Sequence, residues 1–345
     1  MKKLMEYFEY KDNFAKHSTV SSELLFYQNK KEVPIITIAI PAYKRVLMML
    51  EAVKSIAVQA TDVIEIIIVD DNEEGVGLPP EFTEFVINYP LISIAYYKNK
   101  KRIGMMANWN RCIELSRGKW VSILHDDDLL MDNYISKAME TINKLSVEAI
   151  FFNFDMVGSK FNKNVKEKSS LIQNLKKGVK NLQKEVKLLP PSKFYYDFGS
   201  WGTLGTLFLK KHAIELGGFN DDYYPISDYV FFSYYVYKFK KAYINRNVCC
   251  QMRWEVNTSL SLETITKTRD ELRVFMKYLS SIYRIPHIFN KVYCRGKIYR
   301  NAKKSAAITG ISIHEILPKI TLADKLSKIP VSFIIAILIF LYGRK

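Results

Sequence analysis

The chain has few cysteines for its 345 residues, and none stands in a metal-binding or redox spacing. The four are Cys112, Cys249, Cys250 and Cys294, and no two of them form a C-x-x-C pair. This excludes a zinc framework and a disulfide scaffold, and it fits a reduced, cytosolic compartment. Walker A and H-E-x-x-H sequences are absent, and the glycines at 75 and 77 lack the third glycine of a dinucleotide-binding loop.

Negative charge is also scarce. Lys and Arg number 51 against 35 Asp and Glu, which gives a net charge of +16. Such a balance indicates an anionic partner: nucleic acid, an acidic membrane surface or a phosphate-bearing small molecule. We expect no nucleic-acid partner, because the lysine-rich segment lacks the interleaved aromatic residues of a base-stacking platform. With 48% hydrophobic residues, the composition is that of a globular protein of one large or two small domains.

Long hydrophobic runs are missing too. No signal-peptide core follows the N-terminal residues, and residues 331–342, apolar apart from Ser332, fall short of the ~20 residues that a membrane span needs. Lys328 and Arg344 flank this segment. A short apolar helix between cations is expected to lie in the membrane interface, and burial in the core is the alternative. We therefore expect a protein at the cytoplasmic, inner face of the cell membrane, peripheral to it.

From Pro34 onward, short β-branched apolar runs alternate with segments of helical periodicity. Strands are expected at 35–40, 64–69, 92–97, 120–124 and 149–154. Helices are expected at 46–58, 81–88, 105–116 and 132–145. This alternation predicts βαβ units and an α/β fold with a largely parallel sheet. Such sheets bind ligands beyond the carboxyl ends of their strands.

The rest of the chain has a different character. Residues 1–33 are charged, show no clear strand and are interpreted as a helical or loose N-terminal extension. Within 156–262, apolar residues from Leu171 to Leu189 recur at spacings of three and four. This pattern predicts a basic amphipathic helix that either packs on the sheet or lies on a membrane surface. Residues 263–345 are expected to be mainly helical and basic.

Polar and acidic residues directly follow three of the expected strands. They are Pro41-Ala42-Tyr43-Lys44-Arg45, Asp70-Asp71-Asn72 and His125-Asp126-Asp127-Asp128. Because parallel strands end at one edge of a sheet, these side chains are expected to meet in one crevice. Clustered carboxylates repel one another unless a cation is bound among them, and Mg²⁺ takes both carboxylate and diphosphate oxygens. The sequence therefore predicts a site for a metal and a diphosphate.

The order and spacing of these motifs resemble the family 2 inverting glycosyltransferases, which have the GT-A fold. The stretches that match read IAIPAYKR at 38–45, EIIIVDDN at 65–72, NWNRCIEL at 108–115 and HDDDLL at 125–130. The similarity extends from about residue 34 to about residue 262. It implies a Rossmann-like, mostly parallel sheet flanked by helices, followed by a mainly helical C-terminal region.

The resemblance implies a nucleotide-sugar-binding subdomain at 34–155. The residues that would line the nucleotide are Pro41, Ala42, Tyr43 and Arg45. Asp71 would bond the base with Asp70 beside it, and Asp126 would lie near the ribose or the diphosphate. Arg253 matches a residue near the diphosphate in the family, and a surface cation is its alternative interpretation.

The resemblance also implies a metal cofactor, Mg²⁺ or Mn²⁺. Asp127 matches the last Asp of the family's D-x-D element and would ligate the metal. Asp128 is a second metal candidate, or alternatively a turn or capping residue. His125 stands where the family often has the first Asp, and Glu255 stands where it often has a His.

Residues 156–262 would form the acceptor side. Asp228 matches the catalytic base of the family, with Ser227 in place of the usual preceding Glu. A base is needed because a sugar hydroxyl is a poor nucleophile until its proton is removed. Simple N-capping of a helix is the alternative role for Asp228. Trp201 and Gly202 resemble the loop that frames the acceptor.

These residues imply inverting transfer of a sugar from a nucleotide diphosphate donor, expected to be a UDP-sugar, to a hydroxyl acceptor. The family's habits favour bacterial surface polysaccharide or lipid-linked glycan synthesis at a membrane surface. Two alternatives remain. A nucleotidyltransferase also places acids and a metal at strand ends, although it usually has a Gly-rich loop that 41–45 lacks. A catalytically inactive, membrane-associated GT-A-like binding protein would account for the departures at His125 and Glu255.

Overall fold

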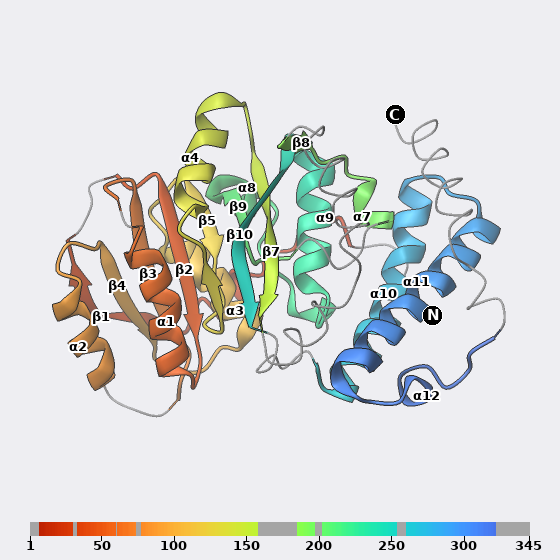
Figure 1. Ribbon diagram of the computed structural model, residues 1–345, viewed down its shortest axis with the longest axis horizontal. Helices are drawn as coiled ribbons and strands as arrows, with labels where there is room; N and C mark the ends of the chain where they lie inside the picture. The colour runs from red at the N-terminus through yellow and green to blue at the C-terminus, as the bar shows by residue number, and fades with distance from the viewer. Residues whose placement is uncertain are drawn as a thin grey trace, which may run out of the picture.

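The computed structural model describes residues 7–29, 33–59, 61–73, 77–157, 185–196, 202–253 and 260–321. Figure 1 shows one twisted sheet with helices on both of its faces, and a helical region beside it that ends the described chain. The ten strands of the sheet follow the order β1-β4-β3-β2-β5-β9-β7-β10-β6, and β8 pairs with β10 off this path.

The first half of the sheet is the parallel part that the sequence predicts. β2 (Ile36–Ala42) lies between β3 (Ile64–Asp70) and β5 (Trp120–Ile123), and β4 (Ile94–Asn99) lies beyond β3, all in parallel. The connecting helices are α1 (Val46–Ala57), α2 (Pro80–Asn88) and α3 (Met105–Leu115). Every residue of β3 is buried, including Glu65 and Asp70, as is typical of a parallel strand covered on both faces.

The second half of the sheet is mixed. β9 (Thr206–Leu209) runs antiparallel to both β5 and β7 (Ala149–Val157), and β10 (Ala242–Arg253) is parallel to β7. The short β6 (Asp128–Leu130) pairs antiparallel with the end of β10. The helices of this half are α4 (Tyr134–Lys144), α7 (Lys193–Tyr196), α8 (Lys210–Glu215) and α9 (Ser227–Phe239). The expected α/β fold with a helical C-terminal region is thus confirmed, with antiparallel strands added to the parallel part.

Two predictions were wrong. Residues 22–28 form strand β1 (Ser22–Gln28), which pairs antiparallel with β4, although no strand was expected before residue 34. None of its residues is fully buried, and Leu24-Leu25-Phe26-Tyr27 shows no alternation of apolar and polar residues, so the strand signal of this edge strand is weak. The expected amphipathic helix does not reach its predicted end, since β8 (Val186–Leu188) pairs with β10 there. The remainder of that helix, 158–184, lies outside the described residues.

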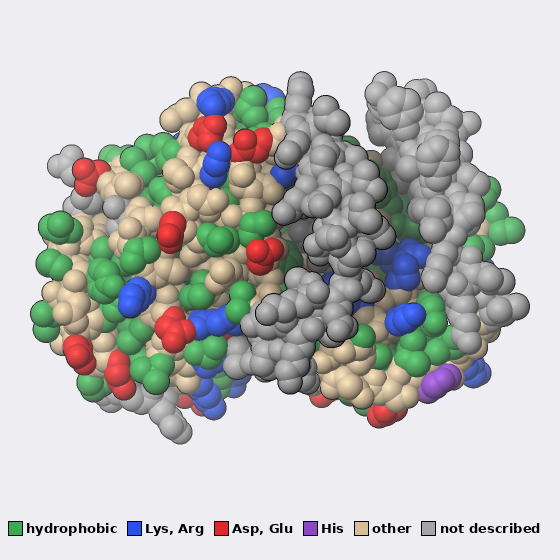
Figure 2. Space-filling view, in the orientation of Figure 1, with side chains coloured by type: hydrophobic (Ala, Val, Ile, Leu, Met, Phe, Trp, Pro, Cys, Tyr) green, Lys and Arg blue, Asp and Glu red, His purple; other side chains and the backbone are tan. Residues whose placement is uncertain are grey.

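The C-terminal region consists of α10 (Leu262–Ile282), α11 (His287–Thr309) and α12 (Ile313–Ile316). Among the described residues, no helix combines the length and apolar character that crossing a bilayer requires. The apolar segment 331–342 lies outside them. On the face shown in Figure 2, acidic and basic side chains are interspersed over the sheet half, so the described part of that face does not concentrate the positive charge over the sheet.

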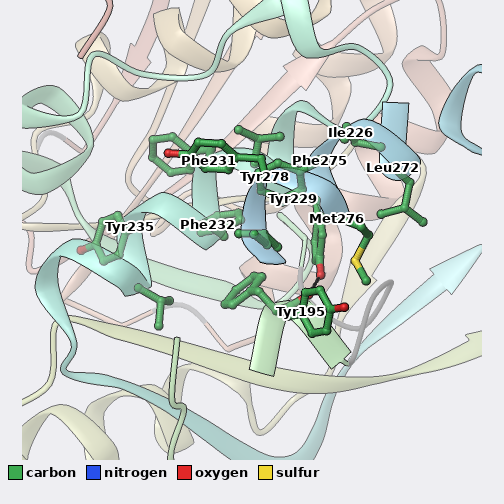
Figure 3. Packing of buried hydrophobic residues seen from close by; sticks show 14 of the residues in the cluster. Tyr195, Ile226, Tyr229, Phe231, Phe232, Tyr235, Leu272, Phe275, Met276 and Tyr278 are labelled. Atoms are coloured by element: carbon green, nitrogen blue, oxygen red, sulfur yellow. Dashed lines mark hydrogen bonds between the residues drawn. The ribbon is translucent and has the colours of Figure 1, made fainter. Parts of the chain in front are cut away.

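An aromatic core fixes α9 between the sheet and α10. Phe232 of α9 contacts Phe151 of β7, with ring centroids 5.5 Å apart, and Tyr229 contacts Phe275 of α10 at 5.7 Å. Figure 3 shows Tyr229 with Phe275 and Met276 of α10 in this cluster. Burial of aromatic side chains on both sides of α9 holds its first turn in place relative to the strand ends. That first turn carries Asp228.

Candidate active site

A cavity of about 710 Å³ opens beyond the carboxyl ends of β2, β3 and β5. Its wall includes Asp71, Asp127 and Asp228, so the three acidic positions singled out in the sequence share one space. Other residues in the wall are Pro41, Ala42, Tyr43, Arg45, Arg102, Trp109, His125, Asp126, Asp128, Gly202, Thr203, Tyr224, Thr264 and Thr268. A cavity of this size is typical of sites for small organic ligands.

The two aspartates that follow β3 have different surroundings. Asp71 lies in the cavity wall, and its carboxylate accepts from the N–H groups of Ile103 and Gly104, both at 2.8 Å, and from Asn99 at 2.9 Å. Burial raises the pKa of Asp71 above its ordinary value in spite of these bonds. Asp71 therefore anchors the turn into α3 at the edge of the cavity.

Asp70 is buried, and it is not among the residues that line the cavity. Its carboxylate accepts from the Tyr96 hydroxyl at 3.0 Å, from Lys98 Nζ at 3.2 Å and from the Asn72 N–H at 2.9 Å. These partners bind the turn after β3 to β4. The structure therefore supports a role for Asp70 in holding its neighbour Asp71, and it shows no path from Asp70 to a ligand.

Arg45, at the start of α1, forms ion pairs with two acids across the cavity. Its Nη1 lies 2.5 Å from Asp127 Oδ2, and its Nη2 lies 2.9 Å from Asp126 Oδ1. The N–H of Tyr43 donates to Asp126 Oδ2 at 3.2 Å. The ring of Tyr43 in turn lies 4.6 Å from the guanidinium carbon of Arg102. Residues 125–128 are called the acid loop below. The predicted nucleotide segment 41–45 and this loop thus contact each other directly.

The acid loop carries a group that could hold a divalent cation. His125, Asp127 and Asp128 each offer one ligand atom, and these atoms lie within 4.8 Å of one another. Burial raises the pKa of Asp128 to about 7, with repulsion from Asp127 as the second cause. A cation would remove this cost. The two carboxylates suit Mg²⁺ or Mn²⁺ in a site completed by ligand oxygens, and an imidazole ligand favours Mn²⁺ of the two.

His125 is held by contacts on two sides. Its ring stacks on Trp109, with centroids 5.0 Å apart, and its Nε2 lies 2.8 Å from the Thr203 hydroxyl oxygen. Burial lowers the pKa of His125, which favours the neutral imidazole that can ligate a metal. The sequence left ligation at this position in doubt, and the structure places the ring within the group.

Arg253 lies behind the acid loop rather than in the cavity wall. Its Nε donates to the carbonyl of Asp127 at 2.5 Å, and its backbone N–H donates to Asp128 Oδ1 at 3.1 Å. Its guanidinium also bonds the carbonyl of Met48 at 3.1 Å and pairs with Glu51, both on α1. Arg253 is therefore neither a free surface cation nor turned toward the cavity, and its predicted diphosphate contact has no support here. Glu255 lies outside the described residues.

Asp228 has a different electrostatic setting from the other acids. Its Oδ1 accepts from the N–H of Tyr229 at 2.7 Å, and no described cation pairs with it. Burial raises its pKa from the ordinary value of 3.8 to about 6. A Cβ atom added to Gly202 would lie 2.6 Å from Asp228 Oδ2, so glycine allows the two segments to approach. Trp201 lies outside the described residues.

A comparison of the sequence with known protein families identifies the domain that carries this geometry. Residues 37–203 match the model of the family described as Glycosyl transferase family 2. The chain contains a family 2 glycosyltransferase domain. The matched range carries strands β2 to β5, the acid loop and Gly202, whereas Asp228 lies beyond it.

Curated relatives of the family 2 domain are only partly covered. An uncharacterized glycosyltransferase of Rickettsia conorii is 27% identical over 174 residues, which are 48% of this chain and 28% of the relative. An uncharacterized protein of Mycobacterium tuberculosis is 27% identical over 111 residues, 32% of each chain. The chain thus spans about a third of the length of these relatives, or less.

Solved structures share the GT-A fold with the chain. Residues 1–349 of Staphylococcus aureus TarS, in complex with UDP-GlcNAc, align with a TM-score of 0.50 at 10% identity, covering 87% of this chain and 91% of that one. The mannosyltransferase PcManGT of Pyrobaculum calidifontis, in complex with GDP-Man and Mn²⁺, aligns with a TM-score of 0.51 at 15% identity, covering 92% of both chains. At this level of identity, the likeness shows the fold.

Several residues that line the cavity were not predicted from the sequence. Arg102 and Tyr224 line the cavity, as do Thr264 and Thr268 from the first turns of α10. The two threonines are four residues apart and therefore share one face of the helix. The same spacing occurs on helix faces that line a cavity and on ordinary surface faces. Only the packing of α10 against α9 shows that this face lines the cavity.

Proposed function

We propose that the protein is a metal-dependent, inverting glycosyltransferase that moves a sugar from a UDP-sugar to a hydroxyl acceptor. The observation that carries this proposal is the single cavity shared by Asp71, Asp127 and Asp228 in a GT-A fold. The UDP-GlcNAc complex of TarS and the GDP-Man complex of PcManGT support a nucleoside diphosphate sugar as the donor class. The choice of UDP over GDP is part of the proposal.

In the proposed reaction, Asp228 is the catalytic base. Its carboxylate accepts the proton of the acceptor hydroxyl while the hydroxyl oxygen attacks the anomeric carbon from the face opposite the leaving group. The carbon is inverted, and the bond to the nucleoside diphosphate breaks with its electron pair on the departing phosphate oxygen. A divalent cation held by Asp127, Asp128 and His125 would supply electrostatic stabilisation to that diphosphate.

The donor and acceptor are proposed to occupy opposite ends of the cavity. Residues 34–155 supply the donor end, where Tyr43 and Arg102 lie together beside Asp71. Residues 156–262 supply Gly202 and Asp228 at the acceptor end, and α10 of the C-terminal region adds Thr264 and Thr268. Threonine hydroxyls in the wall suit an acceptor that carries its own hydroxyl groups, such as a glycan.

The cellular setting is proposed from the sequence. The net charge of +16 and the apolar segment 331–342 between cations favour a peripheral position at the cytoplasmic face of the cell membrane. A lipid-linked glycan of a bacterial surface polysaccharide pathway is the acceptor that such a position suggests. Co-sedimentation with vesicles that contain anionic lipids would test the membrane part separately from the chemistry.

The chemistry is tested with a panel of UDP-, GDP- and dTDP-sugars, each with Mn²⁺ or Mg²⁺. We expect a UDP-sugar with metal to raise the melting temperature most, and turnover to release UDP. Release of pyrophosphate from a nucleoside triphosphate and a sugar 1-phosphate, supplied in a parallel assay, would instead identify a nucleotidyltransferase. Stable donor binding with no turnover on any hydroxyl acceptor or water would favour a catalytically inactive binding protein.

A further inference from the structure

Two arginines contact the acid loop, and they differ in how firmly they are held. Arg253 bonds the backbone carbonyl of Asp127, the side chain of Asp128 and two residues of α1. Its contacts are mainly with main-chain atoms, which a bound ligand would not replace. Arg253 therefore fixes the path of the loop whether or not the cavity is occupied.

Arg45 holds the carboxylates themselves. Its partners are Asp127 Oδ2 at 2.5 Å and Asp126 Oδ1 at 2.9 Å. The side chain of Arg45 is 32% exposed, whereas those of Asp126 and Asp127 are 4% and 9% exposed. The two acids are thus buried beneath a cation whose own side chain is partly exposed.

The contact with Asp127 conflicts with metal binding. Asp127 is one of the three residues whose ligand atoms lie within 4.8 Å of one another. A divalent cation and a guanidinium repel each other at the short distances that both need from the same carboxylate. An arriving cation must therefore compete with Arg45 for Asp127, while Arg253 leaves the loop backbone unchanged.

We propose that Arg45 is an exchangeable counterion of the metal site. Before loading, it neutralises Asp126 and Asp127 in place of the cation. When a divalent cation binds, Arg45 leaves Asp127 and becomes available to the negatively charged diphosphate of the donor, which enters the same cavity. Arg45 thereby weakens the binding of metal alone and favours the joint binding of metal and diphosphate. This inference rests on the proposed metal-dependent function.

The test is the affinity of the full chain for Mn²⁺ alone, measured from the free-ion signal in electron paramagnetic resonance at a pH of about 8, where carboxylates are ionised. We expect Arg45→Gln to lower the dissociation constant by about tenfold, equivalent to about 1.4 kcal/mol for the lost competition. Arg45→Lys keeps the charge but not the two-pronged contact, and we expect an intermediate value.

Arg102→Gln is the matched control. Arg102 also lines the cavity, but its described contact is the ring of Tyr43 rather than the acid loop. We expect its removal to change the Mn²⁺ dissociation constant by less than about twofold, because it removes the same charge without removing a competitor for Asp127. An equal gain in the two glutamine variants would reduce the effect to general electrostatics and overturn the proposal.

Two further outcomes separate this proposal from the function beneath it. If the wild type and Arg45→Gln bind Mn²⁺ equally, the counterion role is wrong and the metal-dependent function stands. If neither binds Mn²⁺, either alone or with UDP, while both remain folded by circular dichroism, the metal-dependent function is wrong and the counterion role with it. A melting temperature that Mn²⁺ raises more in Arg45→Gln than in the wild type would support the proposal independently.

Discussion

The acids of the donor half and the acid of the acceptor half differ in the partners that the fold gives their carboxylates. Asp70 faces Lys98, Asp71 accepts three hydrogen bonds, and Asp126 and Asp127 share Arg45. Asp228 has one backbone N–H and no described cation. Burial raises the pKa of Asp126 as well as that of Asp228 to about 6, so the missing cation, and not the pKa, sets Asp228 apart. Because a neighbouring cation lowers the affinity of a carboxylate for a proton, this difference supports the proposal that the first half binds ligands and that Asp228 takes up the proton.

The most direct way to break this comparison is to remove one acid from each half. We expect Asp228→Asn to lower kcat by about 10²- to 10⁴-fold and to leave donor affinity nearly unchanged, because it removes the base alone. Asp127→Ala is expected to weaken metal-dependent donor binding instead. Steady-state kinetics and calorimetric donor titrations measure both effects. Normal turnover in Asp228→Asn would show that the base lies elsewhere.

The space around Asp228 offers a second test. The added Cβ of Gly202→Ala would lie 2.6 Å from Asp228 Oδ2 and must displace the carboxylate. We expect kcat to fall by about 10- to 100-fold, since small displacements of reacting groups are costly, with donor affinity kept. In the Asp228→Asn background, the same change should cost little further activity. Additive losses would place the effect of Gly202 outside the base.

The pH dependence of kcat is a test of the acceptor half. The proposed base must be a carboxylate to accept a proton, and the pKa of Asp228 is raised to about 6. At saturating donor and metal, kcat should therefore be full well above pH 6 and fall by about tenfold for each pH unit below it. The residual activity of Asp228→Asn should lack this step.

The same raised pKa has a consequence for stability. The folded state holds the proton of Asp228 more tightly than the unfolded state, so this group lowers stability as pH rises from about 4 through about 6. We expect Asp228→Asn to be more stable than the wild type at pH 7 by about 1–2 kcal/mol, a figure reduced because the side chain is only half-buried. Urea unfolding without metal or donor would measure it.

The smallest expected effect concerns the acceptor wall on α10. Thr268→Val keeps the shape of the side chain and removes one hydroxyl from the cavity. We expect the KM for the acceptor to rise about 3- to 10-fold, the value of one hydrogen bond, without a change in donor affinity. Thr266→Val is the control, because the Thr266 hydroxyl bonds carbonyls of its own helix. Equal effects of the two changes would exclude α10 from acceptor binding.

The donor half could be predicted from the sequence because its signals are local. Runs rich in β-branched residues mark β2 and β3, and the acids stand directly after strands, so parallel topology alone brings Asp71 and Asp127 to one edge. The metal group needed more than the motif, since His125 enters it through its contacts with Trp109 and Thr203.

The acceptor half depends on packing between distant residues. Asp228 reaches the cavity because aromatic side chains fix α9 between β7 and α10, and Thr268 reaches it because α10 packs against α9. Periodicity indicates that these helices are amphipathic, but it does not indicate their partners. The guanidinium of Arg253 is a further example, because its direction depends on α1, about 200 residues away in the chain.

The N-terminal residues join the two halves of the site. β1 extends the sheet beyond β4, and Asn13 is hydrogen-bonded through its backbone and side chain to the carbonyl of Gly217, at 2.9 and 3.0 Å. Lys16 pairs with Asp221, seven residues before Asp228. In a hybrid protein that takes residues 34–155 from one relative and the remainder from another, the N-terminal residues would keep their own Gly217 region but would meet a foreign β4. Successful exchange of donor specificity between relatives therefore requires that the first 30 residues match both β4 and the segment around Gly217.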